Sequence, residues 1–304
     1  MNDPDSKGSR AGFVAVVGRP SAGKSTLINA LCGRKVSIIS AVPQTTRNRV
    51  RGIVNVDGGQ LILVDTPGFH VSDRTLNRHM RGLIQETIRD CDLILYLVDA
   101  TRRPGEEEHE LASLIAERGG VTPVVIAVNK SDVASKRDLE RAESLIAKNL
   151  PSHPVVTISA RTGKSTDVLI GMMLKLLPED EPPYPADFYT DQPPEFRVSE
   201  IIREKAIAAT RKELPHSIYV DVADMELRTE EERQTLWIRA FILVERNSQK
   251  GIVVGKGGEK IKQIRQSAQK EIARLFSYAI YLDLRVKVKP NWHRDERLLK
   301  KLVN

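Results

Sequence analysis

The sequence predicts an α/β domain with a mostly parallel sheet and helices on both of its faces, followed by a small α+β domain. Three observations support this division. Short apolar runs alternate with stretches of helical period as far as residue 178. Six prolines then lie within residues 178–194. Beyond them the order of elements changes, and a chain of 304 residues is long enough to form two hydrophobic cores.

The apolar runs of the first domain are short enough to be strands buried on both faces, and the periodic stretches between them are long enough to cross over as helices. The expected strands are residues 13–17, 61–64, 92–98, 124–128 and 155–158, and the expected helices are residues 24–32, 75–90, 106–118, 136–149 and 166–177.

The proline-rich stretch predicts an extended linker, since proline at this density excludes helix and central strand. After it we expect a helix, two strands, a helix and a strand, at residues 199–212, 217–222, 235–245, 259–276 and 281–288. A short basic helix is expected at 298–303. The predicted organisation is a polar tail (1–11), a first domain (12–178), a linker (179–195), a second domain (196–290) and a basic tail (291–304).

Charge is unevenly distributed along the chain. The whole sequence carries a net charge of +7, whereas residues 246–304 hold 15 basic and 5 acidic side chains, a net of +10. Such a segment favours a polyanionic partner, nucleic acid before an anionic membrane surface. The two cysteines cannot form a disulfide framework, and no apolar run is long enough to span a membrane. A reducing cytosol is therefore the expected location.

A phosphate-binding loop is predicted between the first strand and the first helix. Residues 18–25 read GRPSAGKS, which matches GxxxxGK[ST] in the strand–loop–helix context that this motif requires. Its backbone N–H groups and the helix N-terminus would surround phosphate, with Lys24 at the β and γ phosphates and Ser25 on Mg²⁺. The residues expected to bind nucleotide here are Gly18, Arg19, Pro20, Ser21, Ala22, Gly23, Lys24, Ser25 and Thr26.

Three further loops follow predicted strands, so they should converge on the same edge of the sheet. The loop at residue 65 would place a carboxylate beside the metal and the Gly68 N–H near the γ-phosphate. Asp132 would accept two N–H bonds from guanine, which adenine cannot donate, and this disfavours an ATPase. The last loop would bring backbone N–H groups to the guanine carbonyl. The expected residues are Asp65, Thr66, Pro67, Gly68, Phe69, Asn129, Lys130, Ser131, Asp132, Ser159, Ala160 and Arg161.

These four motifs resemble those of the translation-factor-related GTPases. The resemblance implies that Thr46 binds Mg²⁺ together with Ser25 and Asp65, with Thr45 as the alternative, and that Lys24, Thr46 and Gly68 are catalytic. Phe69 stands where Ras-like enzymes carry a glutamine that orients water, which implies slow intrinsic hydrolysis. Potassium is a second candidate ion, but Ser21 replaces the asparagine of potassium-stimulated relatives.

A nucleic-acid-binding loop is predicted in the second domain. Residues 255–258 read GKGG, match GxxG and precede a predicted helix whose apolar residues follow a helical stripe. In KH domains such a loop holds the backbone of about four single-stranded nucleotides. The order of elements is similar to that of a type II KH domain. The residues expected to contact RNA are Gly255, Lys256, Gly257, Gly258, Lys260 and Lys262.

Taken together, residues 12–290 resemble the Era GTPases of bacteria, with QTTR at residues 44–47, DTPG at 65–68, a proline-rich linker and a type II KH domain. The resemblance implies a GTP-hydrolysing switch that exchanges GTP and GDP, binds the 3′ end of 16S rRNA and assists assembly of the 30S subunit. The expected location is the cytoplasm, and a peripheral contact of the basic C-terminal segment with the inner face of the cell membrane is left open. We infer no stable protein partner.

Two other functions remain open from the sequence. One is a regulatory GTPase on a membrane surface, bound through the basic C-terminal segment. The other is a nucleotide-regulated scaffold that binds protein through the acidic residues 181–245, which hold 8 basic and 14 acidic side chains. A second nucleotide site is not expected, since residues 163–165 read GKS but Ile158 stands where the first glycine would be required.

Overall fold

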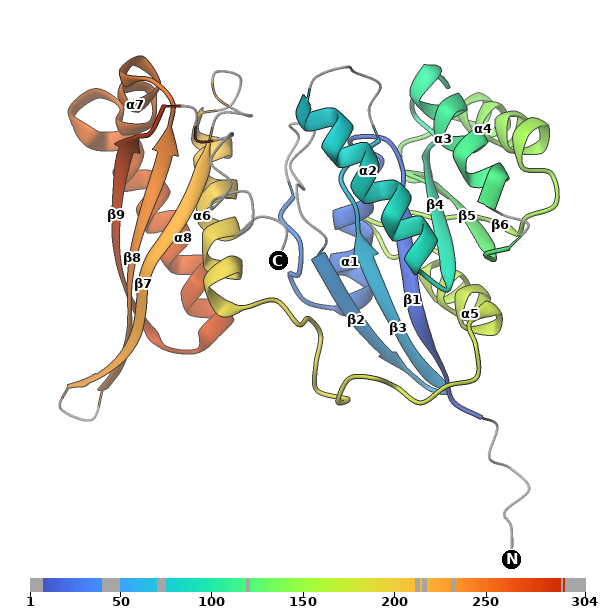
Figure 1. The fold of residues 1–304 in the computed structure, drawn as a ribbon, viewed down its shortest axis with the longest axis horizontal. Coiled ribbons are helices and arrows are strands. Elements are labelled where there is room, and N and C mark those ends of the chain that lie inside the picture. The colour runs from blue at the N-terminus through green and yellow to red at the C-terminus, as the bar shows by residue number, and fades with distance from the viewer. Residues whose placement is uncertain are drawn as a thin grey trace, which may run out of the picture. The chain divides into compact units, whose positions relative to one another are not determined.

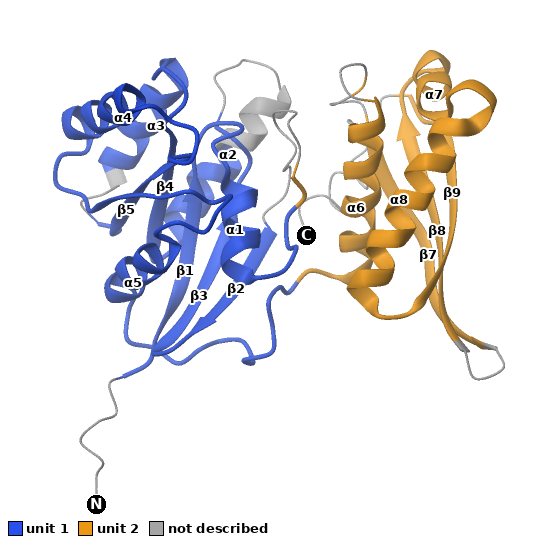
Figure 2. Ribbon diagram, turned by 180° about the vertical axis from the view of Figure 1, so that it is seen from behind, with its two compact units in different colours: residues 1–37, 46–191 blue, residues 38–45, 192–304 orange. Residues whose placement is uncertain are grey.

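The computed structural model describes residues 8–39, 50–69, 75–118, 121–210, 214, 218–230, 233–290 and 292; within these ranges, side chains 75–81, 118, 230 and 233 are not described. Two compact units are present. The first comprises residues 1–37 and 46–191, and the second comprises residues 38–45 and 192–304 (Figure 2). Each unit contains its own buried hydrophobic core.

The first unit is built on a six-stranded sheet with strand order β2-β3-β1-β4-β5-β6 (Figure 1). All neighbouring strands are parallel except β2, which pairs with β3 antiparallel. The strands that end at the predicted nucleotide loops therefore all end at one edge of the sheet. The strands are β1 (Arg10–Val17), β2 (Val50–Val56), β3 (Gly59–Asp65), β4 (Leu93–Asp99), β5 (Val124–Asn129) and β6 (Val155–Thr157).

Helices cover both faces of this sheet. One face packs against α2, α3 and α4, and the other packs against α1 and α5, as the views from front and back show (Figures 1 and 2). The central strands are accordingly buried along their whole length, and β4 and β5 have no exposed residue. The predicted α/β class is confirmed. The helices are α1 (Lys24–Cys32), α2 (Thr75–Asp90), α3 (Glu106–Arg118), α4 (Lys136–Asn149) and α5 (Thr166–Leu176).

Strand β2 was not expected from the sequence. It forms a hairpin with β3, and a two-residue turn at Asp57 and Gly58 joins the two strands. Gly58 has φ +88°, a conformation that glycine adopts without strain. The Asp-Gly pair between β-rich runs is a strong hairpin signal, and it could have revealed this strand.

The proline-rich stretch contains neither helix nor strand up to residue 193, but it is bound to the first unit. Its backbone exchanges two hydrogen bonds with the buried Gln60 amide: Tyr184 N donates to Oε1 (3.0 Å), and Nε2 donates to Tyr184 O (2.9 Å). Further along, the Ile53 N–H donates to Tyr189 O (3.0 Å), and Arg51 forms an ion pair with Asp191 (2.8 Å). We call residues 178–191 the strap, because they are held along β2 and β3.

The second unit has a three-stranded sheet with order β7-β8-β9, in which β7 and β8 are antiparallel and β8 and β9 are parallel. Helices α6 and α8 pack on one face of this sheet, and their apolar side chains join the inward residues of β8 and β9 in one core. The α+β class is confirmed. Its main elements are α6 (Pro194–Thr210), β7 (Tyr219–Glu230), β8 (Arg233–Val244), α7 (Asn247–Val254), α8 (Glu259–Phe276) and β9 (Ala279–Val288).

Two elements of this unit differ from the prediction. Helix α6 begins at Pro194, five residues before the expected start, since proline is favoured in the first turn of a helix. Helix α7 is additional, since no element was expected between residues 245 and 259. Its Gly251 and β-branched residues disfavour helix, so the burial of Val253 against the core overrides the local preference.

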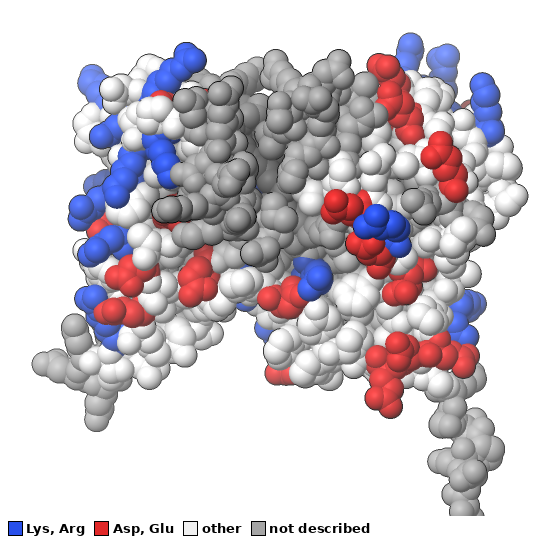
Figure 3. Space-filling view, viewed as in Figure 1, with Lys and Arg blue, Asp and Glu red and all other residues white. Residues whose placement is uncertain are grey.

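The expected helix at residues 298–303 lies outside the described residues. Within the described part of the chain, no helix has both the length and the apolar character to span a bilayer. On the face drawn in Figure 3, Lys and Arg side chains lie along the outer edge of the second unit, at the left of the view, where Figure 1 places β9.

Candidate functional site

The loop between β1 and α1 has the backbone geometry of a phosphate cradle. Gly23 has φ +102°, and a Cβ there would lie 2.4 Å from the Asn129 Nδ2. A Cβ on Gly18 would lie 2.5 Å from the Leu97 carbonyl oxygen. Both positions thus require glycine, because a side chain would clash with a neighbouring atom. Gly23 is required by its positive φ as well. Ser21 also has a positive φ, +63°, and is exposed at the outer side of the loop.

Lys24 lies in the first turn of α1 and is buried beneath the loop. Its Nζ donates to Gly18 O (2.9 Å) and Arg19 O (3.1 Å). Burial lowers the pKa of Lys24 to about 8, against the opposing attraction of Asp65 and Glu108. The ammonium is therefore held under the loop at the place where it would meet the phosphates of a nucleotide.

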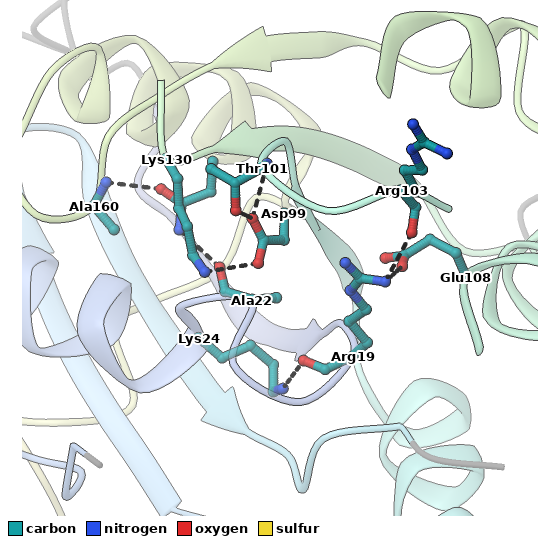
Figure 4. Close-up of polar contacts among 10 residues, drawn as sticks. Arg19, Ala22, Lys24, Asp99, Thr101, Arg103, Glu108, Lys130 and Ala160 are labelled. Atoms are coloured by element: carbon teal, nitrogen blue, oxygen red, sulfur yellow. Dashed lines mark hydrogen bonds and ion pairs between the residues drawn. The ribbon is translucent and has the colours of Figure 1, made fainter. Parts of the chain in front are cut away.

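The Arg19 side chain does not point toward the loop's concave side. Its guanidinium forms a buried ion pair with Glu108 of α3 (2.8 Å) and also donates to the Arg103 carbonyl (3.3 Å), as Figure 4 shows. Burial raises the pKa of Glu108 to about 7 although Arg19 acts in the opposite direction. Sequence reasoning missed Glu108. In this structure Arg19 offers only its backbone to the predicted site, and its side chain joins the loop to α3.

Asp65 and Ser25, two of the predicted metal ligands, contact each other. The Ser25 hydroxyl donates to Asp65 Oδ2 (2.9 Å), and Asp65 is fully buried at the end of β3. A hydroxyl and a carboxylate are the oxygen donors that Mg²⁺ takes together with phosphate oxygens and water. Among the described residues, no group of three or more His, Cys, Asp or Glu could hold a metal alone. The donor set here therefore fits Mg²⁺ bound jointly by protein and nucleotide.

The loop after β3 is packed directly against the phosphate loop. The Phe69 N–H donates to Gly18 O (3.1 Å), and a Cβ on Gly68 would lie 2.7 Å from the Cα of Pro20. The buried Thr66 hydroxyl donates to the Val16 carbonyl (2.8 Å). The Phe69 side chain lies in the core with α2 and α3, so no part of it can orient water.

The loops after β5 and β6 are tied to the phosphate loop by Asn129. Its Nδ2 donates to Ala22 O (2.8 Å), and its Oδ1 accepts from Ala160 N (2.9 Å). The Ser131 N–H donates to the Ile158 carbonyl (3.1 Å). One amide side chain thus joins three of the loops that the sequence predicted to converge.

Lys130 forms an ion pair with Asp99, a residue that the sequence prediction omitted. Its Nζ pairs with the buried Asp99 at the end of β4 (2.7 Å), whose other oxygen accepts from the Thr101 N–H (3.0 Å) and hydroxyl (2.6 Å) (Figure 4). Lys130 itself has φ +70°, a rare conformation outside glycine. The signal was available, because Asp99 ends a buried strand at the same edge of the sheet as Asp65.

Asp132 has two partners in the loop after β6. Its Oδ1 accepts from the Ser159 hydroxyl (2.8 Å), and its Oδ2 pairs with the Arg161 guanidinium. The Ser159 hydroxyl lowers the pKa of Asp132, and Arg161 adds to that effect, so the carboxylate is charged at neutral pH. The GKS sequence at 163–165 lies in the turn before α5, as expected, and not in a second cradle.

The predicted metal ligand Thr46 and its alternative Thr45 lie outside the described residues. Their roles therefore stay predictions.

The glycine loop of the second unit lies between α7 and α8. Gly255, Gly257 and Gly258 have φ of +74°, +59° and +80°, so three glycines adopt conformations that other residues rarely adopt. At Gly257 and Gly258 nothing lies within 4 Å of a built Cβ. The loop is therefore open on this side, and it leads directly into the N-terminus of α8.

The three predicted lysines do not lie on one face. Lys256 is exposed in the loop itself, whereas Lys260 and Lys262 lie in the first turn of α8. Residues two apart on a helix point to opposite sides, so only one of these two lysines can lie on the same side of α8 as the open face of the glycine loop.

Comparison with known proteins identifies both units. A family model described as a 50S ribosome-binding GTPase matches residues 13–130, and a KH-domain model matches residues 213–293. The "GTPase Era" of Treponema denticola is 43% identical over 96% of this chain and 99% of its own length. Those of Borreliella burgdorferi and Geobacter metallireducens are each 42% identical, over 97% and 96% of this chain and 100% and 97% of their own lengths.

Two solved structures agree with this. A crystal structure of Era in complex with MgGDPNP and nucleotides 1506–1542 of 16S ribosomal RNA has a TM-score of 0.88 and 36% identity, and covers 97% of this chain and 98% of that one. A variant of Aquifex aeolicus Era bound to GDP and aluminium fluoride has a TM-score of 0.87 and 35% identity, covering 96% and 98%. With a GTPase unit followed in the sequence by a KH unit, the chain belongs to the family of Era GTPases.

Proposed function

We propose that this GTPase is a guanine-nucleotide switch that binds ribosomal RNA through its second unit and assists assembly of the 30S subunit. The observation that carries the proposal is the network around Asn129, which joins the phosphate loop to both loops of the guanine site. Family membership supports GTP hydrolysis, and the Era complex with 16S rRNA supports the RNA partner.

In the proposed site each residue contacts a particular part of the nucleotide. Lys24 neutralises the β and γ phosphates, and the loop N–H groups and the start of α1 bind their oxygens. Gly68 offers a backbone N–H to the γ-phosphate at the loop packed on Pro20. Asp132 accepts the N1–H and amino N–H of guanine. Since the Phe69 side chain is in the core, water must be oriented by another group, which supports a slow intrinsic rate.

Mg²⁺ is the proposed metal. The Ser25 hydroxyl and the adjoining Asp65 carboxylate would hold it, and Thr46 would be a further ligand in the GTP state. When bound, it neutralises charge on the transferring phosphoryl group. Potassium receives at most an accessory role, because Ser21 presents a short hydroxyl on an exposed part of the loop.

The guanine assignment is tested by Asp132→Asn. The exchange replaces an acceptor by a donor, so the protein should lose affinity for GDP and gain affinity for xanthosine diphosphate, by up to about 10⁴-fold in preference. Equilibrium titration with both nucleotides measures it. Asp138→Asn is the matched control, because this partly exposed carboxylate bonds Ser135 and Arg141 at the start of α4, so its change should leave the base preference unaltered. An unaltered GDP preference in Asp132→Asn would contradict the assignment.

The proposed RNA site is the glycine loop of residues 255–258, with Lys256 as the exposed counter-charge. We expect Gly257→Asp to weaken binding of an RNA containing the 3′-terminal segment of 16S rRNA at least tenfold, because it places a negative charge where phosphates approach. The Cβ has space there. Filter binding measures the effect.

Gly257→Asn provides the matched control for the Gly257→Asp prediction, since asparagine has the same shape without the charge and tolerates positive φ. Equal losses in the two variants would assign the effect to backbone strain and contradict a phosphate contact.

We propose a cytoplasmic location, where ribosomal subunits assemble. Sedimentation with vesicles of anionic lipid, in the presence and absence of RNA, distinguishes this from the membrane-surface alternative. Binding to vesicles that exceeds binding to RNA at equal salt would favour that alternative.

A further inference from the structure

The guanine-reading carboxylate already has a cationic partner within the same site. Arg161, the fourth residue after β6, pairs with Asp132 Oδ2, whereas Ser159 donates to Oδ1 (2.8 Å). The Ser159 hydroxyl also accepts from the Thr162 N–H (3.2 Å), so it is fixed within its own loop. Both oxygens of Asp132 are thus engaged, and by residues of different kinds.

The two partners lie on different sides of the carboxylate. Ser159 is fully buried, so it holds Asp132 from the protein side. The Arg161 side chain is 69% exposed and that of Asp132 only 13% exposed, so the guanidinium is the outer of the two. A base that enters from solvent meets this guanidinium before it reaches Asp132.

Guanine and the Arg161 guanidinium offer similar donors to the Asp132 carboxylate. Guanine presents N1–H and its amino group as adjacent, coplanar donors, and a guanidinium presents a planar fork of N–H donors. A carboxylate that can accept two hydrogen bonds from guanine can therefore also accept two from a guanidinium.

We propose that Arg161 is an internal competitor of guanine, which occupies Asp132 in the nucleotide-free protein and must move aside when the base binds. The proposal rests on the proposed reading of guanine by Asp132. It makes Arg161 a residue that tunes nucleotide affinity and exchange rather than a ligand of the base. The Arg161 backbone remains free to serve the site as predicted.

The size of the effect follows from the exposure of the pair. Ion pairs with one partner largely in water contribute little, so removing the competitor should tighten binding by about two- to fivefold. Arg161→Ala should therefore lower the dissociation constant for GDP and raise its association rate by this factor. Stopped-flow measurement with a fluorescent GDP analogue gives both quantities.

Lys164→Ala is the matched control, because it removes the same charge from an exposed side chain of the same turn with no bond to Asp132. It should leave GDP binding unchanged or slightly weaker. In Asp132→Asn, which has no carboxylate to pair with, adding Arg161→Ala should no longer tighten binding of xanthosine diphosphate.

Two results would overturn the proposal. One is that Arg161→Ala binds GDP no more tightly than Lys164→Ala does. The other is that the gain persists in Asp132→Asn. Failure of the guanine assignment itself is a separate result, since it appears in Asp132→Asn alone as an unaltered base preference.

Discussion

At the scale of single residues, Lys24 is the group whose ionisation responds most directly to the nucleotide. Its ammonium is buried beneath the phosphate loop, and burial lowers its pKa to about 8. Phosphate oxygens stabilise the charged form, so binding must raise this pKa again. Above pH 8 the free protein has partly lost the proton that the bound protein holds, and nucleotide affinity should fall as the pH rises through this range.

This predicts proton uptake on binding. At pH 8.5, a free-state pKa of about 8 corresponds to uptake of roughly three-quarters of a proton with GDP, and at pH 6.5 to none from this group. Isothermal titration in buffers of different ionisation enthalpy measures it. Lys24→Arg keeps the charge at every pH, so it reports the titration of the nucleotide itself. Equal uptake by the two proteins at pH 8.5 would mean that Lys24 does not titrate there.

At the scale of elements, the strap is a part of the first unit rather than a loose connection. Gln60 is fully buried and makes three hydrogen bonds, two with the Tyr184 backbone and one with Asn55 Oδ1 (2.6 Å). Arg51 and Tyr184 also share the Asp191 carboxylate. The strap is bound to β2 and β3, and β3 ends at Asp65, so the same hairpin contacts the linker and carries one of the predicted nucleotide loops.

Gln60→Ala should detach the middle of the strap. It leaves the Tyr184 N–H and carbonyl without their partner, which should lower the free energy of unfolding of the first unit by about 1–3 kcal/mol. Amide hydrogen exchange across residues 184–190 should rise as well. Asp187→Ala, an exposed change in the same segment, should alter stability by less than about 0.5 kcal/mol. An unchanged rate of amide hydrogen exchange in Gln60→Ala would mean that the other hydrogen bonds are sufficient to hold the strap.

At the scale of the whole molecule, positive charge is concentrated in the unit that is proposed to bind RNA. Residues 246–304, which contain the glycine loop, carry a net charge of +10, whereas the whole chain carries +7. RNA binding should therefore depend on salt, and Lys256→Ala should reduce the slope of log affinity against log salt by about 0.7. Binding titrations between low and physiological salt measure it. The exposed Lys175→Ala in the first unit should leave the slope unchanged; an equal reduction there would mean that RNA follows the overall charge and not the loop.

The sequence by itself determined the order of the elements other than β2 and α7, and the positions of the predicted nucleotide and glycine loops. The cradle at residues 18–25 is local, since its glycines, Lys24 and Ser25 are neighbours in the chain, and the strand before it and helix after it have strong periodicity. Parallel strands then bring the carboxyl ends of β3, β5 and β6 to one edge, which follows from the class of fold alone.

Only the tertiary structure decided which partner each polar side chain takes. Arg19 belongs to the loop that the sequence predicts to bind nucleotide, yet its side chain pairs with Glu108 of α3, far along the chain. Asp99 supports Lys130, and Arg161 covers Asp132, through contacts between loops of different strands. Helix α7 forms because its Val253 is buried, against its local preference. Such pairings depend on distances between separate elements, and local patterns of residues carry no information about those distances.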